Sequence, residues 1–387
     1  MNTKELAQKY ESYIIEQRRY FHRHPELSLE EFETTDYIAK ELDKMSIPYI
    51  RPTATGLIAT IEGNGPGQCV GLRADIDALN VTEKTEVDYK SQNDGKMHAC
   101  GHDAHTAMLL GAAKILQDCK ADFKGKVKLI FQPAEEVAQG AKQLIAAGGW
   151  FDEVDNFFGA HIWSNSPSGT VSLEAGGRMA AADWFEIKVT GRSGHGSMPD
   201  QCVDAVVVAS AIVMNLQTLV SRETSPLDPL VVSVGTVKAG TRFNIIAGEA
   251  FMDGTNRYFS KAIAETIEAD MKRIVEGTAA IYRATADLDY RKVTPPLINE
   301  AASSALARAA ALKIYDEAAI ILAPATTGGE DFAYYIQDKP GCFAFIGCAN
   351  AEKGTDFPHH NECFNVDEAV LANGSALYAQ YALDFLA

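Results

Sequence analysis

Apolar positions along the first half of the chain follow two spacings in turn, and this predicts a domain of mixed helices and strands. Between residues 3 and 45 apolar side chains recur every three or four positions, with a break at Pro25, as in amphipathic helices. Short apolar runs at 56–60 and 68–72 indicate strands, and helical spacing starts again near His102. Further segments continue the alternation: KVKLIFQ, QGAKQLIAAGG and FFGAHIW. Strands that alternate with helices predict an α/β fold whose mixed, largely parallel sheet is sandwiched by helices.

The pattern changes near residue 180. A strand with polar–apolar alternation, DWFEIKVTG, is followed by a glycine-rich loop and a long apolar helix over 204–219. Two strands, a second helix and a last strand at about 284–290 complete this stretch. The order β-α-β-β-α-β is the split-βαβ pattern of a small, ferredoxin-like α+β domain.

The alternation of strands and helices seen in the first half returns after Pro295, with an alanine-rich helix over 299–315 and the strand CFAFIGC. The simplest organisation is therefore one domain inserted into another. We expect a discontinuous domain at 1–180 and 295–387, and an inserted domain at 181–294.

Composition narrows the functional classes. The 387 residues include 52 acidic and 35 basic side chains, so the formal net charge is −17, with 47% hydrophobic and 22% charged residues. These fractions are typical of a soluble globular protein. The negative charge argues against nucleic acid as a partner and disfavours an anionic membrane surface. The longest apolar run, Ala205 to Leu216, is about half of the roughly 20 residues that a membrane span needs.

Cysteine usage indicates a reducing compartment. The seven cysteines are scattered, odd in number and contain no CxxC pair, which does not resemble a disulfide framework. The N-terminal segment mixes charged and apolar residues and lacks the apolar core of a signal peptide. We therefore expect a cytoplasmic protein.

The densest chemical signal is the segment HACGHDAH. It places Cys100 beside His98, His102 and His105 in a turn that contains Gly101. Imidazole and thiolate are the ligands that a borderline metal such as Zn²⁺ prefers. One such histidine would more often be a capping or surface group, but a cysteine and three histidines in one glycine-containing turn favour a metal site.

Two further segments place chemistry-bearing residues at the ends of predicted strands. In FQPAEE, the adjacent carboxylates Glu135 and Glu136 follow a buried strand, and neighbouring side chains of an extended segment point apart. One carboxylate can then bind a metal while the other serves as a general base. His161 lies at the end of the strand FFGAHIW. Each feature alone also fits a solvated or structural group, but together they indicate one site at the carboxyl edge of a sheet.

The full set of motifs resembles the family of aminoacylases, hippurate hydrolases and indole-acetyl-amino-acid hydrolases, which are co-catalytic metal amidohydrolases related to metallopeptidases. The motifs occur in the expected order across nearly the whole chain. They are HRHPELS, GLRADIDAL, MHACGHDAHTAMLLGAA, FQPAEE, GAHIW, GRSGHGSMP, GTNR, GGEDFAYY and HHNECF.

The resemblance implies two divalent metal ions per subunit, drawn from Zn, Mn, Co and Ni, and five ligands. Cys100 would bridge the ions. His102 and Glu136 would serve on one side, and His161 and His360 on the other, with the assignment to each ion left open.

The resemblance also implies roles for five other residues. Glu135 would be the general base, and Asp75 would orient a metal-bound histidine. His195, in the inserted domain, would stabilise the oxyanion and usually reaches into the partner subunit's site, which implies a homodimer, with a tetramer as the larger alternative. Asn244 and Arg257 are candidates for holding the substrate carboxylate.

From these expectations we predict that the protein catalyses metal-dependent hydrolysis of the amide bond of N-acyl amino acids. These substrates are small, and an activated water molecule would cleave them. The nearest alternative is a dipeptidase or carboxypeptidase that uses the same two-metal site. Two other classes stay open, a metal-binding protein without catalysis and a redox sensor that acts through Cys100. The filled general-base and ligand positions speak against the first of these.

Overall fold

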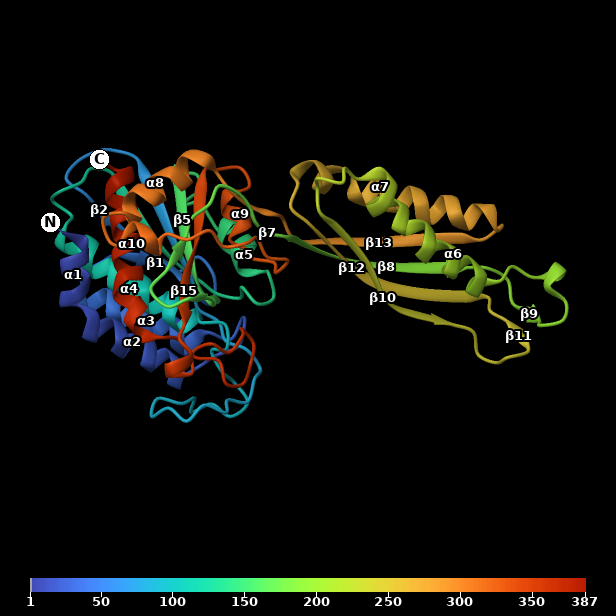
Figure 1. Ribbon diagram of the computed structural model, residues 1–387, viewed down its shortest axis with the longest axis horizontal. Coiled ribbons are helices and arrows are strands. Elements are labelled where there is room, and N and C mark those ends of the chain that lie inside the picture. The colour runs from blue at the N-terminus through green and yellow to red at the C-terminus, as the bar shows by residue number, and fades with distance from the viewer. Residues whose placement is uncertain (1) are drawn as a thin grey trace. The chain divides into compact units, whose positions relative to one another are not determined.

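The computed structural model describes residues 2–387 and divides the chain into two compact units (Figure 1). Unit 1 contains the described residues up to Gly176, together with Ile298–Pro324 and Tyr334–Ala387. Unit 2 contains Gly177–Leu297 and Ala325–Ala333. Where the chain passes between the units, β7 (Gly176–Met179) and β14 (Leu297–Asn299) pair with each other.

The segment 325–333 belongs to unit 2, whereas the sequence analysis placed it in the discontinuous domain. Its Thr326 N–H donates to the carbonyl of Arg178 at 2.9 Å, and its carbonyl accepts the N–H of Ala180 at 3.1 Å. These backbone bonds join a late segment to the start of the inserted unit. No local pattern signals such pairing, because its partners lie almost 150 positions apart in the sequence.

The sheet of unit 1 has seven strands in the order β1-β2-β4-β3-β5-β15-β6. The strands are β1 (Tyr49–Ile50), β2 (Leu57–Glu62), β3 (Cys69–Asp75), β4 (Lys126–Gln132), β5 (Asn156–Pro167), β6 (Val171–Ser172) and β15 (Gly341–Ala349). Strands β4, β3, β5 and β15 run parallel to one another, while β1, β2 and β6 add antiparallel edges. The predicted mixed, largely parallel sheet is confirmed.

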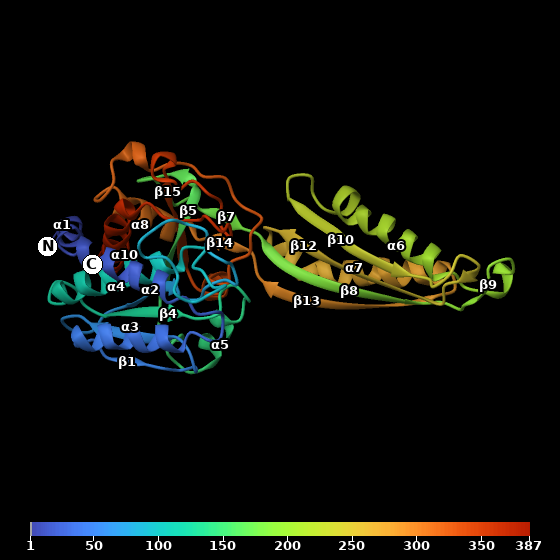
Figure 2. The same cartoon turned by 90° about the horizontal axis from the view of Figure 1, so that it is seen from below.

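Helices lie on both sides of this sheet, with α4 and α10 on one side and α5 and α9 on the other (Figures 1 and 2). The helices are α1 (Thr3–Lys9), α2 (Glu11–Arg23), α3 (Phe32–Lys44), α4 (His102–Asp118), α5 (Gly140–Ala146), α8 (Ala301–Ala311), α9 (Ala333–Ile336) and α10 (Leu371–Phe385). Helix α4 is buried along nearly its whole length. A Cβ at Gly111 would lie 2.4 Å from Ser375 Oγ and 2.7 Å from Ile14 Cγ1, so this glycine lets α2 and α10 approach α4 closely.

Unit 2 is the predicted split-βαβ domain. Its antiparallel sheet has the order β10-β12-β8-β13, and α6 and α7 cover one face (Figures 1 and 2). The elements are β8 (Ala181–Thr190), β9 (Gly194–His195), α6 (Ala205–Thr218), β10 (Leu230–Ala239), β11 (Ile245–Ile246), β12 (Glu249–Tyr258), α7 (Lys261–Ile281) and β13 (Thr285–Thr294). Buried and exposed residues alternate along β8, as the sequence pattern predicts for a sheet with one face covered by helices.

Helix α6 and the helical turn after it, Ala205–Glu223, are long and apolar enough to cross a membrane by length and composition alone. The sequence estimate stopped earlier, at Leu216, because polar residues interrupt the run. In the folded domain, Val208 and Ile212 lie on the buried face of α6 within the hydrophobic core of unit 2. Part of its apolar composition is therefore accounted for by packing inside the domain.

A buried ionic network ties α2 to α4 in unit 1. The Arg18 Nε donates to Asp103 Oδ2 at 2.9 Å, and His22 Nδ1 lies 2.8 Å from the same oxygen. His22 Nε2 lies 3.1 Å from Glu83 Oε1. Burial opposes the charged form of His22, but hydrogen bonds to the Asp103 and Glu83 carboxylates outweigh burial and raise its pKa. The network fixes the start of α4, the helix whose first residue is the metal-ligand candidate His102.

Removing one member of this network leaves charge buried without its partner. We expect Arg18→Met to lower the free energy of unfolding by about 3–5 kcal/mol, measured by urea denaturation. Arg51→Met, which breaks an exposed ion pair with Asp36, is the control and should cost about 0–1 kcal/mol. Equal losses in the two variants would contradict the structural role of Arg18.

Candidate metal centre

Three neighbouring parallel strands bring the site together. The register sets Asp75 at the end of β3 opposite Gln132 of β4, and Arg73 opposite Gly159 of β5. Continuing that parallel register two residues further places His161 level with Asp75. The loop that carries the two glutamates begins directly after Gln132. The carboxyl edge of the sheet therefore gathers residues from separate motifs, as α/β sheets do.

The turn before α4 adds two more side chains. Gly101 has φ +92°, a left-handed conformation that glycine adopts without steric cost, and it separates Cys100 from His102 at the first position of the helix. The late motif joins the same turn, because the His360 N–H donates to the carbonyl of Ala99 at 2.8 Å. His360 itself has φ +65°, which is uncommon for a residue with a side chain.

The potential ligand atoms form two groups that share Cys100. Within each group, one donor atom per residue lies within 4.8 Å of the others: Cys100 with His102 and His161, and Cys100 with Glu136 and His360. Glu136 Oε1 lies 3.5 Å from His360 Nε2 and 3.9 Å from His102 Nε2. The structure thus brings together the donor atoms of all five predicted ligands. His102 lies in a group with Cys100 and His161, and in another with Glu135 and Glu136.

His102 presents one free ring nitrogen to this cluster. Its Nδ1 lies 2.9 Å from the carbonyl oxygen of Asp77 and 3.2 Å from Asp77 Oδ1, so Nδ1 carries a proton and donates it. Nε2 is buried and has no hydrogen-bond partner within residues 2–387. Burial opposes a charged ring, but Asp75 and Asp77 raise the pKa of His102 to about 10. An orphaned nitrogen surrounded by negative charge is suited to a cation.

His161 and Cys100 complete that side of the cluster. His161 Nδ1 lies 2.5 Å from the carbonyl oxygen of Ile162, which leaves Nε2 directed at Cys100 Sγ, 3.5 Å away. Burial lowers the pKa of His161 well below its ordinary value, so the ring is neutral, the form that binds metals. Burial and the carboxylates of Glu136 and Glu135 raise the pKa of the Cys100 thiol. Only a nearby cation would favour the thiolate there.

Asp75 lies against two histidines of α4. Its Oδ1 lies 2.6 Å from His105 Nδ1, and its Oδ2 accepts a bond from Arg73 Nη1 at 2.7 Å and lies 3.7 Å from His102 Nε2. His105 Nε2 accepts the N–H of Ile162 at 2.8 Å, so both ring nitrogens of His105 are engaged and it is not a ligand candidate. Asp77, two residues further on, holds Nδ1 of His102. The Asp75–His105 pair acts on the site through the backbone beside His161.

Asp77 and His105 are the site residues that the sequence analysis did not assign. Both had a signal. Asp77 repeats the two-residue spacing of Asp75 in GLRADIDAL, and His105 lies one turn after His102 in HACGHDAH. Choosing between the alternatives required the packing of α4 against β3.

The remaining predicted residues lie in unit 2. His195 of β9 pairs with Ile245 of β11, and the Gly196 N–H donates to the carbonyl of Asn244 at 2.8 Å, so His195 and Asn244 are close. The Ser197 N–H donates to His195 Nδ1 at 3.2 Å. Nδ1 accepts this bond, which leaves Nε2 as the donor of the ring, on the exposed two-stranded β9–β11 ribbon.

Arg257 lies at the other end of the same unit. It is the ninth residue of β12, whose first residue follows shortly after β11 of the β9–β11 ribbon. At about 3.4 Å per residue, eight steps along the strand separate Arg257 from that end by roughly 27 Å. Figure 1 shows β9 and β11 at that end of the sheet. Arg257 donates through Nε to the Thr327 carbonyl at 3.1 Å and through Nη1 to the Asn256 carbonyl at 2.9 Å.

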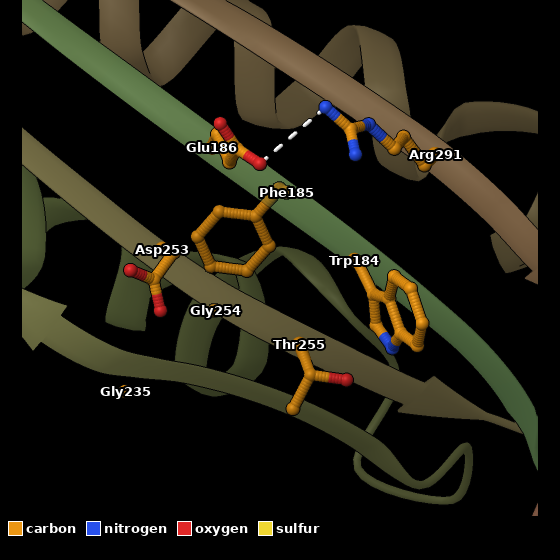
Figure 3. Close-up of a pocket in the computed structure, with 8 residues that line it drawn as sticks. All are labelled: Trp184, Phe185, Glu186, Gly235, Asp253, Gly254, Thr255 and Arg291. Atoms are coloured by element: carbon orange, nitrogen blue, oxygen red, sulfur yellow. Dashed lines mark ion pairs between the residues drawn. The ribbon is translucent and has the colours of Figure 1, made fainter.

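A separate hollow lies on the uncovered face of the unit 2 sheet (Figure 3). Trp184, Thr255 and Arg291 line it, together with Glu186 and Asp253. Arg291 pairs with Glu186 at 3.4 Å. None of the predicted site residues lines this hollow, so it does not change the location of the candidate site.

Comparison with known proteins agrees with the geometry. Peptidase family M20/M25/M40 matches residues 71–384. An N-acetyl-L-cysteine deacetylase from Bacillus subtilis is 40% identical over 94% of this chain and 86% of its own, and a thermostable carboxypeptidase 2 from Saccharolobus solfataricus is 38% identical over 98% and 97%. The crystal structure of a Bacillus subtilis protein described as a dinuclear metal binding peptidase of family M20 superposes with a TM-score of 0.86, 36% identity and coverage of 98% and 99%. The chain belongs to peptidase family M20/M25/M40 and is a metal-dependent amide hydrolase.

Proposed function

We propose that this protein hydrolyses the amide bond of N-acyl amino acids at a centre of two divalent metal ions. The observation that carries the proposal is the sharing of Cys100 between two groups of donor atoms, Cys100–His102–His161 and Cys100–Glu136–His360. A thiolate common to both groups can bridge two ions, and imidazole with carboxylate completes each site. Zn, Mn, Co and Ni all accept such ligands.

The ions, when bound, would polarise the amide carbonyl and make a water molecule acidic enough to react near neutral pH. The protein supplies the proton transfers. Glu135 lies beside Glu136 and His102 and is the general base. Its carboxylate takes a proton from the attacking water and later passes that proton to the leaving nitrogen. Asp75 acts on the same centre through His105.

The oxyanion that forms during attack needs a hydrogen-bond donor. His195 fits this role because Ser197 donates to Nδ1 and Nε2 is left to donate to an oxyanion. Asn244, held against the same β9–β11 ribbon, can donate its amide to the substrate carboxylate.

Arg257 is the second candidate for binding that carboxylate, because a guanidinium matches a carboxylate in shape and charge. Within one chain, however, Asn244 and Arg257 lie at opposite ends of the unit 2 sheet, too far apart to hold one small carboxylate. We therefore assign them to different subunits of a shared site. This division supports a homodimer, with a tetramer as the larger alternative.

The outer face of α6 offers a surface for that association. Val206, Val207 and Met214 are exposed there, Met214 by 69%. Helix α6 packs beside β10, an edge strand of the sheet with exposed Val231 and Val237. Exposed apolar side chains next to an unpaired strand edge are typical of a protein interface.

A dipeptidase or carboxypeptidase is the alternative function. The similarity to a thermostable carboxypeptidase is nearly as strong as the similarity to a deacetylase. Both reactions cleave an amide next to a free carboxylate and would use the same metal centre. The seven cysteines are all free thiols, which supports a reducing, cytoplasmic location.

Chelation tests the metal requirement, and Glu135→Gln tests the base. We expect a chelator to abolish hydrolysis and Zn²⁺, Mn²⁺ or Co²⁺ to restore it. Glu135→Gln should lower kcat by roughly 10²–10⁴-fold, because the amide cannot accept the proton, without changing the bound metal measured by elemental analysis. Glu352→Gln, on an exposed turn, is the control. Full activity in Glu135→Gln would refute the base role.

A substrate panel separates the two reactions. N-acetyl amino acids, hippurate and dipeptides differ only in the group on the carbonyl side of the amide. We expect kcat/KM for an acyl-amino acid to exceed that for the matching dipeptide, because the proposed site needs only an uncharged acyl group. A preference for the dipeptide would favour the peptidase alternative.

Charge on the outer face of α6 tests the assembly. Met214→Asp should convert the dimer to a monomer in size-exclusion chromatography with light scattering, and hydrolysis should fall with it because His195 then lacks a partner. Ile281→Asp, an equally exposed position at the end of α7, should leave both unchanged. A monomeric wild-type protein with full activity would contradict the shared site.

A further inference from the structure

The turn that carries the two glutamates has a strained backbone. Ala134, between Pro133 and Glu135, has φ +54°, in the left-handed region that residues with a side chain seldom occupy. Such a conformation persists only where the surroundings impose it. Contacts around the turn therefore decide where Glu135 points.

Two buried carboxyl groups hold the turn, one on each side of Glu135. The Ala134 N–H donates to Glu31 Oε1 at 2.8 Å. The Glu136 N–H donates to Asp77 Oδ2 at 3.0 Å. Asp77 also orients His102, so it belongs to the metal centre. Among the described residues, Glu31 forms no hydrogen bond or ion pair with a proposed ligand. It bonds the amide of Ala134, the residue directly before the proposed base Glu135.

Glu31 is itself firmly placed. Its residue is fully buried, directly before α3. Its carbonyl accepts the Thr35 hydroxyl at 2.6 Å, and the Thr35 oxygen accepts the N–H of Gly56 at 2.8 Å. Gly56 lies against the turn so closely that a Cβ there would be 2.5 Å from Pro133 Cδ. A closed chain of contacts thus runs from Glu31 through α3 and Gly56 back to the turn.

We propose that Glu31 is a positioning residue for Glu135: by accepting the Ala134 amide it keeps the turn left-handed and holds the general base toward the reacting water. This inference rests on the proposed function of Glu135. It assigns a role to the HPELSLEE segment, which the metal ligands and the base leave without one.

The chemistry of Glu31 points to the matched replacement. Burial, with the negative charge of Asp77 adding to it, raises the pKa of Glu31 to about 7. Oε1 can accept the Ala134 N–H whether or not the other oxygen carries a proton. Glutamine keeps an acceptor oxygen of the same shape without the charge, whereas leucine removes the acceptor.

The experiment compares Glu31→Leu with Glu31→Gln in the metal-loaded enzyme. In Glu31→Leu the Ala134 N–H is buried without a partner, so we expect kcat to fall roughly tenfold to a hundredfold, with KM within about twofold and the same bound metal. Glu31→Gln should keep kcat within about threefold of wild type, below the tenfold that one lost contact costs. Glu41→Leu is the control, since Glu41 is a buried carboxylate of α3 that contacts Tyr13 and Lys44 instead.

A second readout does not depend on activity. Hydrogen–deuterium exchange of the Ala134 amide in the metal-free protein should speed up in Glu31→Leu and stay slow in Glu31→Gln. Unchanged exchange or wild-type kcat in Glu31→Leu would overturn the inference, as would an equal loss of kcat in Glu31→Gln or Glu41→Leu. An active Glu135→Gln would instead overturn the proposed function, so the two failures are distinguishable.

Discussion

The cost of burying negative charge is the constraint on which this molecule depends. Asp75 and Asp77 are buried at the sheet edge where the partly buried Glu136 lies beside Cys100, so water screens the two aspartates little. The fold meets this cost with directed partners. Arg73 pairs with Asp75 and His105 is hydrogen-bonded to it, while the Glu136 N–H and the Ser28 hydroxyl donate to Asp77. Within residues 2–387, His102 Nε2 and Glu136 Oε1 are buried without a hydrogen-bond partner, and a metal ion would satisfy both atoms. The same buried charges therefore influence both the stability of the fold and the affinity of the site for a metal ion.

Periodicity in the sequence was enough to predict most of the fold. Alternation along DWFEIKVTG and helical spacing after Lys261 are local signals, and they identified the inserted split-βαβ unit correctly. The grouping of 325–333 with that unit could not be predicted. It depends on backbone hydrogen bonds of Thr326 with Arg178 and Ala180. Such bonds do not depend on which side chains the residues carry.

The candidate site divides in the same way. Cys100 and His102 are recognisable because a glycine turn and a helix start place them together within three residues. The partners of the histidines are not recognisable, since Asp75 and Asp77 offer the same carboxylate group to two histidines of one helix. The packing of α4 against β3 brings His105 Nδ1 to Asp75 and His102 Nδ1 to Asp77. The roles of the ligands remain proposals, while their proximity is a property of the fold.

The burial of α4 has a consequence for how the protein can change over evolutionary time. Its first residue is the ligand candidate His102, and its remaining turns form the centre of the hydrophobic core. Any substitution that shifts the helix disturbs folding and chemistry together, so this region tolerates little variation. The two-stranded β9–β11 ribbon that carries His195 is exposed. New substrate preferences can therefore arise at its positions other than His195 without shifting α4 or the metal-ligand candidates.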